Sequence, residues 1–159
     1  MVRATMDQTA VPDRRVVGRE TIQRLLLERR QMLVLFCRAA GLDPYPHEEG
    51  AQEVLPEFCR VLIDYVAAAH FSLYRRIVDG VERRQALIAL ADELYPQIEA
   101  CTETALVFND KYDAADHAYD GVELSADLSE LGEALAKRIE LEDRLIDVMI
   151  VPRAPSPVH

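Results

Sequence analysis

Two ionisable residues, Asp64 and His70, stand in a segment that is otherwise nearly all apolar in its inner half, FCRVLIDYVAAAHFSLYRRI at residues 58–77. A carboxylate and an imidazole can pair with charged side chains, bind a cation or transfer a proton. A helix that is apolar nearly all round belongs inside a bundle, and a carboxylate buried there needs a partner. We therefore expect Asp64 and His70 to meet polar side chains from a neighbouring helix.

A second pair of charged residues interrupts an apolar stripe near the end of the chain. The stripe runs through Leu124, Leu128, Leu131, Leu135, Arg138, Glu142, Leu145 and Met149. Arg138 and Glu142 are spaced i,i+4 and can pair along one helix. If both face inwards, Arg138 can also pair with Asp64. Glu142 can pair with His70 in the same way, which would complete a polar layer inside the bundle.

This polar layer has three possible roles, of which the sequence leaves two open. It can be a satisfied buried network that fixes the register of the helices, or a polar groove for the side chains of a partner. If the helix is rotated slightly so that Ile139 and Ile146 face the core, Arg138 and Glu142 would instead lie at the edge of its buried face. A di-iron centre needs Glu-x-x-His motifs, and no histidine here has a glutamate three residues before it. We therefore expect no metal and no cofactor.

Side chains for covalent catalysis are not placed together either. Cys59 and His70 would lie about 16 Å apart along one helix, which is too far for a nucleophile and its base. His70 and Tyr74 can share a hydrogen bond, but Tyr74 fits equally well as a packing residue at the edge of the bundle. No phosphate-binding glycine loop and no cofactor motif occurs. We therefore expect that the protein is not an enzyme.

Length and composition indicate one domain with a single core. The chain has 159 residues, of which 50% are hydrophobic, enough to bury a core. It has no apolar run of transmembrane length and no hydrophobic segment typical of a signal peptide. Cys37, Cys59 and Cys101 are far apart and lack CxxC spacing, which favours reduced thiols over disulfides or zinc. We expect a cytoplasmic protein.

The net charge of −10 is unevenly distributed. Residues 1–91 contain 13 Lys/Arg and 12 Asp/Glu, whereas residues 92–143 contain 3 and 15. Such acidic helices can simply keep a protein in solution, or they can form a surface for a basic partner protein. They would repel phosphates, so we expect no direct binding of nucleic acid.

Apolar periodicity predicts four long helices, over about residues 17–40, 51–79, 81–113 and 122–151. Gly41 is placed to end the first helix. Pro56 lies near the first turn of the second, where a missing N–H is tolerated. Pro96 predicts a kink or a break in the third helix.

Short connections between long helices imply antiparallel neighbours, so we expect an all-α fold, an antiparallel four-helix-type bundle. The expected organisation is a flexible N-terminal arm over residues 1–16, the helical bundle over residues 17–151 and a disordered tail over residues 152–159. The oligomeric state stays open.

Four segments together carry a recognisable pattern: residues 58–77 as quoted above, LYPQIEACTE at 94–103, FND at 108–110 and LGEALAKRIELEDRLIDVMI at 131–150. The last of them contains the motif R-x-x-L-E-D, formed by Arg138, Leu141, Glu142 and Asp143. Over about residues 17–151 the chain resembles the regulator of sigma D family (Rsd/AlgQ). Members of this family are bacterial anti-sigma factors that bind the primary sigma factor of RNA polymerase.

The resemblance implies a bundle that captures the C-terminal, promoter-reading domain of the sigma factor, a basic helix-turn-helix unit. Binding would be competitive, since an occupied sigma domain could neither dock on the polymerase nor read a promoter. The acidic balance of residues 92–143 fits a basic partner independently, because opposite fields raise association rates. The partner-binding cluster that we predict consists of Asp64, His70, Phe71, Tyr74, Arg138 and Glu142.

Two other functions fit the same features. The protein could be a regulatory adaptor that binds a phosphocarrier or a stress-signalling enzyme, because acidic bundle surfaces serve that role equally well. It could also be a sensor that binds a small ligand in its core. A pull-down from cell lysate would separate the first from an anti-sigma factor, and ligand-dependent thermal stabilisation would mark the second.

Overall fold

The computed structural model describes residues 14–42, 51–74, 85–113 and 120–150. Within these residues the chain forms four long helices and one short π-helical turn, and no strand. The elements are α1 (Arg14–Ala40), α2 (Ala51–Ala69), η1 (His70–Tyr74), α4 (Gln85–Tyr112) and α5 (Gly121–Ile150). The predicted all-α class is confirmed.

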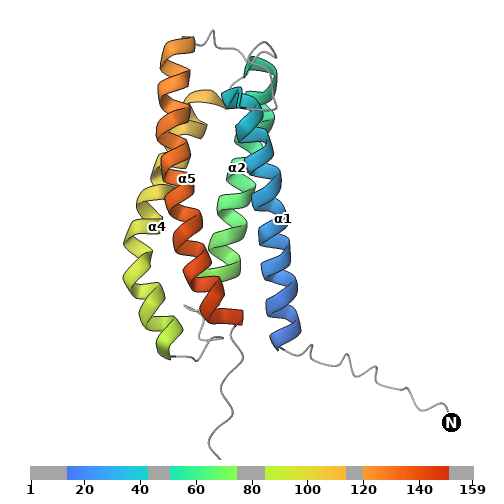
Figure 1. Ribbon diagram of the computed structural model, residues 1–159, viewed down its shortest axis with the longest axis vertical. Helices are drawn as coiled ribbons and strands as arrows, with labels where there is room; N and C mark the ends of the chain where they lie inside the picture. Colours follow the sequence, from blue (N-terminus) through green and yellow to red (C-terminus); the bar gives the residue numbers. More distant parts are fainter. Residues whose placement is uncertain (1–13, 43–50, 75–84, 114–119, 151–159) are drawn as a thin grey trace, which may run out of the picture.

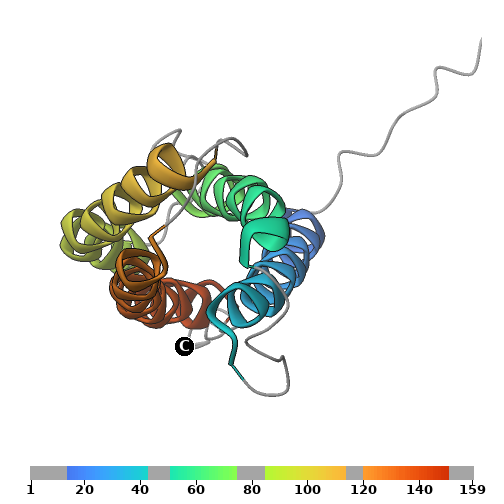
Figure 2. The same ribbon diagram turned by 90° about the horizontal axis from the view of Figure 1, so that it is seen from above.

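The four long helices stand side by side and alternate in direction (Figure 1). Figure 2 shows them from above as a ring in the order α1, α2, α4, α5. The pairs α1–α2 and α4–α5 pack most extensively, α2 and α4 join the two pairs, and α1 meets α5 over a much smaller area. This arrangement is the predicted antiparallel bundle, with one seam less tightly closed than the others.

The core follows from the apolar spacing of each helix. On α2 and η1, buried apolar residues recur at helical spacing: Val54, Leu55, Phe58, Cys59, Leu62, Tyr65, Val66, Ala69 and Leu73. Phe58 lies at the centre, with its ring 6.0 Å from that of Phe36 on α1 and 5.9 Å from that of Phe108 on α4. Each large apolar side chain buried in this way stabilises the fold by roughly 1.5–3 kcal/mol.

Gly41 ends α1, as predicted. It has φ 66°, a backbone conformation that glycine adopts without strain. The N–H of Leu42 donates to the carbonyl of Cys37 at 2.9 Å, and the N–H of Gly41 donates to that of Arg38 at 3.2 Å. These two bonds satisfy carbonyls that the end of a helix otherwise leaves without partners.

Of the two alternatives predicted at Pro96, a kink or a break, the break does not occur. The helix α4 runs through Pro96 from Gln85 to Tyr112. Proline inside a helix costs about 3 kcal/mol or more. Leu94 and Ile98 are both buried on either side of it, and their packing holds the backbone helical while Pro96 itself is exposed.

The second predicted helix changes its form near its end. Regular α-helix continues to Ala69, and the π-helical turn η1 follows over His70–Tyr74. The rest of the predicted helix, residues 75–79, lies outside the described part of the chain. None of the helices within the described ranges has the length and apolar character to span a membrane.

The ends of the predicted domain can be compared only in part. The helix α1 begins at Arg14 and so includes the last residues of the stretch that we expected to be a flexible arm. The remainder of that arm, residues 1–13, and the predicted tail, residues 152–159, lie outside the described residues.

Candidate functional site

A layer of buried polar side chains crosses the bundle, and Glu142 of α5 lies at its centre. Glu142 is fully buried. Its Oε2 accepts hydrogen bonds from Nη2 of Arg29 on α1, at 3.0 Å, and from the hydroxyl of Tyr65 on α2. Its Oε1 accepts a bond from Nε of Arg138 at 2.6 Å. A single carboxylate therefore joins α1 and α2 to α5.

Arg138 extends the layer to the fourth helix. Its Nη1 donates to Oγ1 of Thr102 on α4, and its Nη2 donates to the carbonyl of Val66 at 3.4 Å. Its guanidinium also lies 5.9 Å from the centre of the Tyr65 ring, within the range of a cation–π contact. Every long helix thus contributes at least one polar group to the layer.

The charges of the layer balance. Besides Glu142, Arg29 also pairs with Asp143, Nη1 to Oδ1, at 2.6 Å. With Arg138, the layer holds two arginines and two carboxylates. Because each buried charge has an opposite charge and hydrogen bonds, the cost of removing it from water is offset.

The pKa shifts of Tyr65 and Arg29 agree with the hydrogen bonds that these residues make in the layer. Burial and the neighbouring carboxylate of Glu142 raise the pKa of Tyr65 well above that of a free tyrosine, so its hydroxyl keeps the proton that it donates. Burial alone would lower the pKa of Arg29, but its contacts with Tyr65, Asp143 and Glu142 raise it above its ordinary value.

The prediction that Arg138 and Glu142 face the core and pair along one helix is confirmed. Their exposed fractions are 1% and 0%, so neither lies at the edge of the buried face of the helix or in an open groove. Of the three roles considered for the layer, the satisfied buried network fits this geometry. We therefore assign both residues to the support of the bundle.

The predicted partners of this pair are wrong. Asp64 is on the outer side of α2, with 63% of its side chain exposed, and pairs with Arg60 at 3.6 Å. His70 is exposed as well. Tyr65, the residue after Asp64, takes the inward position that we had expected for Asp64. A tyrosine can bury its ring and satisfy one hydroxyl, whereas a buried aspartate must compensate a full charge.

Two further residues of the predicted cluster lie in η1. Phe71 is exposed to 56%, and its ring meets that of His70 edge-on with centroids 5.5 Å apart. Tyr74 ends η1, but its side chain falls outside the described part of the structure. Asp64, His70 and Phe71 therefore share the outer surface of α2 and η1, away from Arg138 and Glu142.

A carboxylate that the sequence did not single out lies beside Asp64. Glu28 of α1 is half-buried, and its Oε2 is closed to solvent with no hydrogen-bond partner among the described residues. Burial raises the pKa of Glu28, Arg24 opposes this shift, and the negative charge of Asp64 adds to it. We call Glu28, Asp64, His70 and Phe71 the α1–α2 face. Only the packing of α1 on α2 brings Glu28 there.

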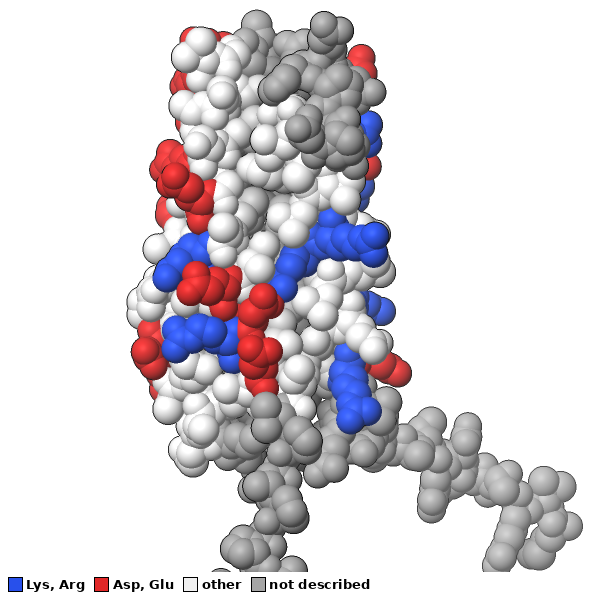
Figure 3. Space-filling view, viewed as in Figure 1, with Lys and Arg blue, Asp and Glu red and all other residues white. Residues whose placement is uncertain are grey.

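The acidic part of the chain forms the surface of α4 and α5. Its exposed carboxylates include Asp92, Glu93, Glu99, Glu103, Asp110, Glu123, Glu130, Glu133 and Glu140. In the view of Figure 3, Asp and Glu gather mainly over α4 and α5, whereas α1 shows chiefly Lys and Arg. The uneven charge along the sequence thus becomes an uneven charge around the molecule.

At one end of this surface, a small cluster ties α4 to α5. Nζ of Lys111 contacts Glu123 and lies 2.8 Å from Oδ2 of Asp127, which also accepts a bond from the hydroxyl of Tyr112. The bonds from Lys111 and Tyr112 lower the pKa of Asp127. Burial and the bond to Asp127 raise the pKa of Tyr112 to about 12.

Comparison with known proteins gives one consistent result. The model of a family described as "Regulator of RNA polymerase sigma(70) subunit, Rsd/AlgQ" matches residues 6–150. A "Regulator of sigma D" from Yersinia enterocolitica is 36% identical over 131 residues, covering 80% of this chain and 78% of the relative. Another, from Enterobacter sp. (strain 638), is 37% identical over 131 residues, covering 79% of this chain and 77% of the relative. No solved structure gives a significant match.

Proposed function

The chain belongs to the Rsd/AlgQ family of regulators of the RNA polymerase sigma(70) subunit, and from this premise we propose that it binds and sequesters the C-terminal, promoter-reading domain of the primary sigma factor. The family consists of regulatory binding proteins, in agreement with the prediction that the chain is not an enzyme. A captured sigma domain could neither dock on the polymerase nor read a promoter. This activity would take place in the bacterial cytoplasm, where transcription occurs.

The observation that carries the proposal is the composition of the α1–α2 face. A domain that reads promoters needs basic side chains to contact phosphates. On the α1–α2 face, Glu28 and Asp64 present two neighbouring carboxylates, and Oε2 of Glu28 has no partner among the described residues. An arginine or lysine of the sigma domain would pair with the exposed carboxylate of Asp64 and relieve the repulsion between the two carboxylates.

Phe71 supports the same assignment. It follows Asp64 by seven residues, about two helical turns, so both emerge on the same side of α2 and η1. Its ring is largely exposed, and aromatic rings beside charged groups are frequent anchors of protein interfaces. The π-helical turn that carries it is an irregularity often found at functional sites.

The acidic surface of α4 and α5 has a different part in the proposal. It lies on the other pair of helices, and its charges are exposed and partly screened by salt. We assign to it the long-range attraction of the basic sigma domain, which raises the rate of association more than the final affinity.

The test is a binding titration between the full-length protein and the purified sigma C-terminal domain. We expect a complex at micromolar concentrations or below. Asp64→Ala and Glu28→Gln should each weaken it about tenfold, which corresponds to about 1.4 kcal/mol. Asp92→Ala, which removes an exposed carboxylate from α4, is the matched control and should change the affinity less than about twofold.

Two results would count against the proposal. If no complex forms at micromolar concentrations, the anti-sigma function is excluded. If the complex forms but Asp64→Ala and Asp92→Ala weaken it equally, the sigma domain does not dock on the α1–α2 face.

A further inference from the structure

Three large apolar side chains lie exposed on one side of α1. Leu26, Leu27 and Val34 have exposed fractions of 41%, 57% and 41%. Arg30 is exposed as well and lies about one helical turn from each of them. Single exposed apolar residues are ordinary on a protein surface, whereas a group of them on one face is typical of interaction sites. We call these four residues the α1 stripe.

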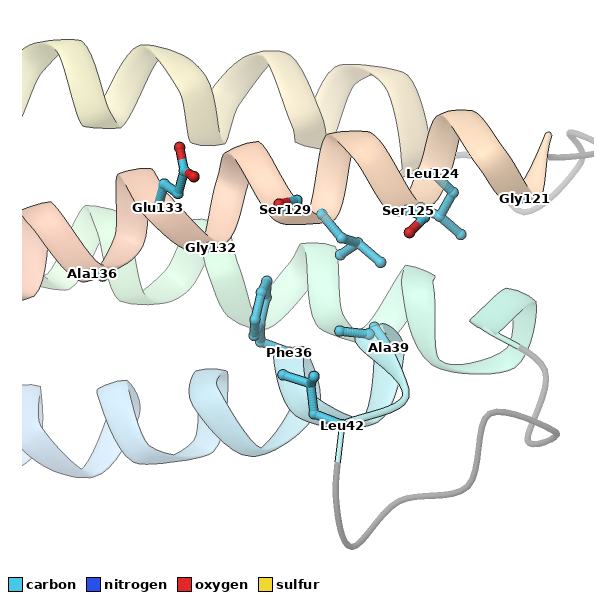
Figure 4. A pocket seen from close by; sticks show the side chains of 12 residues that line it. Phe36, Ala39, Leu42, Gly121, Leu124, Ser125, Ser129, Gly132, Glu133 and Ala136 are labelled. Atoms are coloured by element: carbon cyan, nitrogen blue, oxygen red, sulfur yellow. The ribbon is translucent and has the colours of Figure 1, made fainter.

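The α1 stripe is separate from the groove that α1 and α5 border. On the α1 side, this groove of about 740 Å³ is lined by Phe36, Ala39, Ala40 and Leu42. Figure 4 shows Phe36, Ala39 and Leu42 on this wall. No residue of the α1 stripe is among those that line the groove, so the stripe forms a surface of its own.

The charges around the α1 stripe are mainly basic. Among residues 18–40, the exposed charged residues are Arg19, Arg24, Arg30 and Glu20. Arg30 belongs to the stripe itself, with the two leucines on one side of it along the helix and Val34 on the other. Another basic surface would be repelled here. The α1 stripe suits a surface that combines apolar side chains with carboxylates.

A surface of that kind exists on the same molecule, on the exposed side of α4. Leu106 and Val107 have exposed fractions of 41% and 58%. Glu103 and Asp110, both exposed, lie about one helical turn before and after them. We call these four residues the α4 stripe. Like the α1 stripe, it has two adjacent apolar residues with a charged residue one turn away, but the charge is opposite.

The wider surroundings of the α4 stripe are acidic too. The other exposed carboxylates of α4 are Asp92, Glu93 and Glu99. Lys111 is the one exposed cation within the range of α4, and it is already paired with Glu123 and Asp127 of α5. The α4 stripe therefore has the charge that the α1 stripe requires of its occupant.

The two stripes of one molecule cannot meet each other. The long helices form a ring in the order α1, α2, α4, α5, so α1 and α4 lie diagonally across the bundle (Figure 2). Their exposed sides therefore point in opposite directions. The α4 stripe can cover the α1 stripe only if it comes from another copy of the protein.

We propose that copies of this protein associate head to tail, with the α1 stripe of one copy on the α4 stripe of the next. Charge selects this pairing, because two α1 stripes would place Arg30 near Arg30, and two α4 stripes would place Glu103 near Glu103. Apolar residues three and four positions apart on both helices allow them to pack side by side. The proposal goes beyond the binding of sigma and does not depend on it.

The association is expected to be weak and open-ended. Each copy has a net charge of −10, so two copies repel each other at a distance. Contact along one pair of helices is also small, and interfaces below about 1,200 Å² are typical of transient complexes. Because each copy uses two different surfaces, copies can form rings or longer chains. The average mass should therefore rise steadily with concentration.

The experiment measures the average mass of the full-length protein alone by sedimentation, between about 10 μM and 1 mM. Leu27→Glu introduces a carboxylate into the basic stripe, and Val107→Lys introduces a cation into the acidic one. Each should weaken the association about tenfold or more. Val122→Lys makes the same change at a position of α5 that is 81% exposed, and should leave the association within about twofold.

A mixture of the two variants gives the sharpest test. The Leu27→Glu variant keeps an intact α4 stripe, and the Val107→Lys variant keeps an intact α1 stripe. Mixing them should restore association at concentrations where neither variant associates alone. Restored association would also show that both variants are folded.

Several outcomes would overturn the proposal. One is a wild-type protein that stays a single chain up to about 1 mM, and another is a mixture in which no association returns. Association that is lost in Leu27→Glu but kept in Val107→Lys would show that copies meet through α1 alone. If the wild-type protein stays single but binds a helical peptide of leucine and glutamate, and Leu27→Glu abolishes that binding, the α1 stripe serves another protein instead. No sigma domain is present in these measurements, so the two proposals fail separately.

Discussion

At the scale of single residues, the bundle buries one of two consecutive polar side chains and exposes the other. Asp64 and Tyr65 are consecutive, yet Asp64 is exposed while Tyr65 is fully buried and bonded to Glu142. Consecutive residues of a helix point about 100° apart, which is enough to place one in water and the next in the core. The buried Tyr65 thereby supports the fold, and the exposed Asp64 is free to have the partner-binding role that we propose for it.

This separation predicts opposite effects for two substitutions. Asp64→Ala removes only an exposed ion pair, so the free energy of unfolding should change by less than about 0.5 kcal/mol. Glu142→Ala leaves two arginines without their shared carboxylate, and should cost about 3–5 kcal/mol. Urea unfolding followed by circular dichroism measures both. A loss of several kcal/mol in Asp64→Ala would show that this residue belongs to the buried layer after all.

The buried tyrosines predict a loss of stability at alkaline pH. The pKa of Tyr65 and of Tyr112 is raised in the folded state above the ordinary 10.0, for Tyr112 to about 12. Because the unfolded chain releases these protons first, their contribution to stability is complete below pH 10. It is lost as the pH rises through the raised values. Urea unfolding above pH 10 should show the free energy of unfolding falling as the pH rises. In Tyr65→Phe this fall with pH should be less steep. An unchanged slope in Tyr65→Phe would contradict the assignment.

At the scale of helices, the bundle consists of two well-packed pairs joined through α2 and α4. On the flank of α1 that faces α5, Arg29 bonds to Glu142 and Asp143, and the Phe36 ring packs against Gly132. Beyond the Arg29 contact the two helices border a groove of about 740 Å³. Arg29 is therefore the charged residue that ties α1 to α5.

Arg29→Met is expected to loosen α1. It keeps most of the apolar volume but leaves Glu142 with one donor fewer and a charge less well compensated, at a cost of about 3–5 kcal/mol. Hydrogen exchange should then quicken in α1 more than in α4, because the lost bonds join α1 to α5. Arg30→Met, at the exposed neighbouring position, is the control and should leave exchange nearly unchanged. Equal acceleration in all four helices would show that the layer stabilises the bundle as a whole and does not hold α1 in particular.

At the scale of the whole molecule, charge is distributed by helix pair. The exposed carboxylates of α4 and α5 lie on the surface of these two helices (Figure 3), whereas the residues that we propose for sigma binding lie on α1, α2 and η1. In our proposal, one surface attracts a basic protein from a distance and another binds it on contact.

This division predicts that salt acts mainly on the rate of association. Raising the ionic strength from about 0.05 to 0.3 M shortens the Debye length, and the association rate with the sigma domain should fall by about tenfold. The dissociation rate should change much less, because it depends on the close contacts of the α1–α2 face. Stopped-flow kinetics measures both. An effect of salt confined to dissociation would remove the steering role of α4 and α5.

The sequence by itself determined the features that depend on neighbours along the chain. The apolar spacing predicted the four helices, Gly41 marked the end of α1, and the i,i+4 spacing of Arg138 and Glu142 predicted their pairing. Each of these involves residues within about a turn or two of helix, where geometry is set by the backbone alone.

Only the tertiary structure decided the partners across the bundle. Arg29 lies 113 residues from Glu142 in sequence, and Tyr65 lies 77 residues from it. Which of Asp64 and Tyr65 turns inwards depends on the rotation of α2, and the position of Glu28 beside Asp64 depends on how α1 packs against it. The continuity of α4 through Pro96 and the open groove beside α5 likewise result from packing. These outcomes depend on the combined burial of all four helices, which no local spacing records.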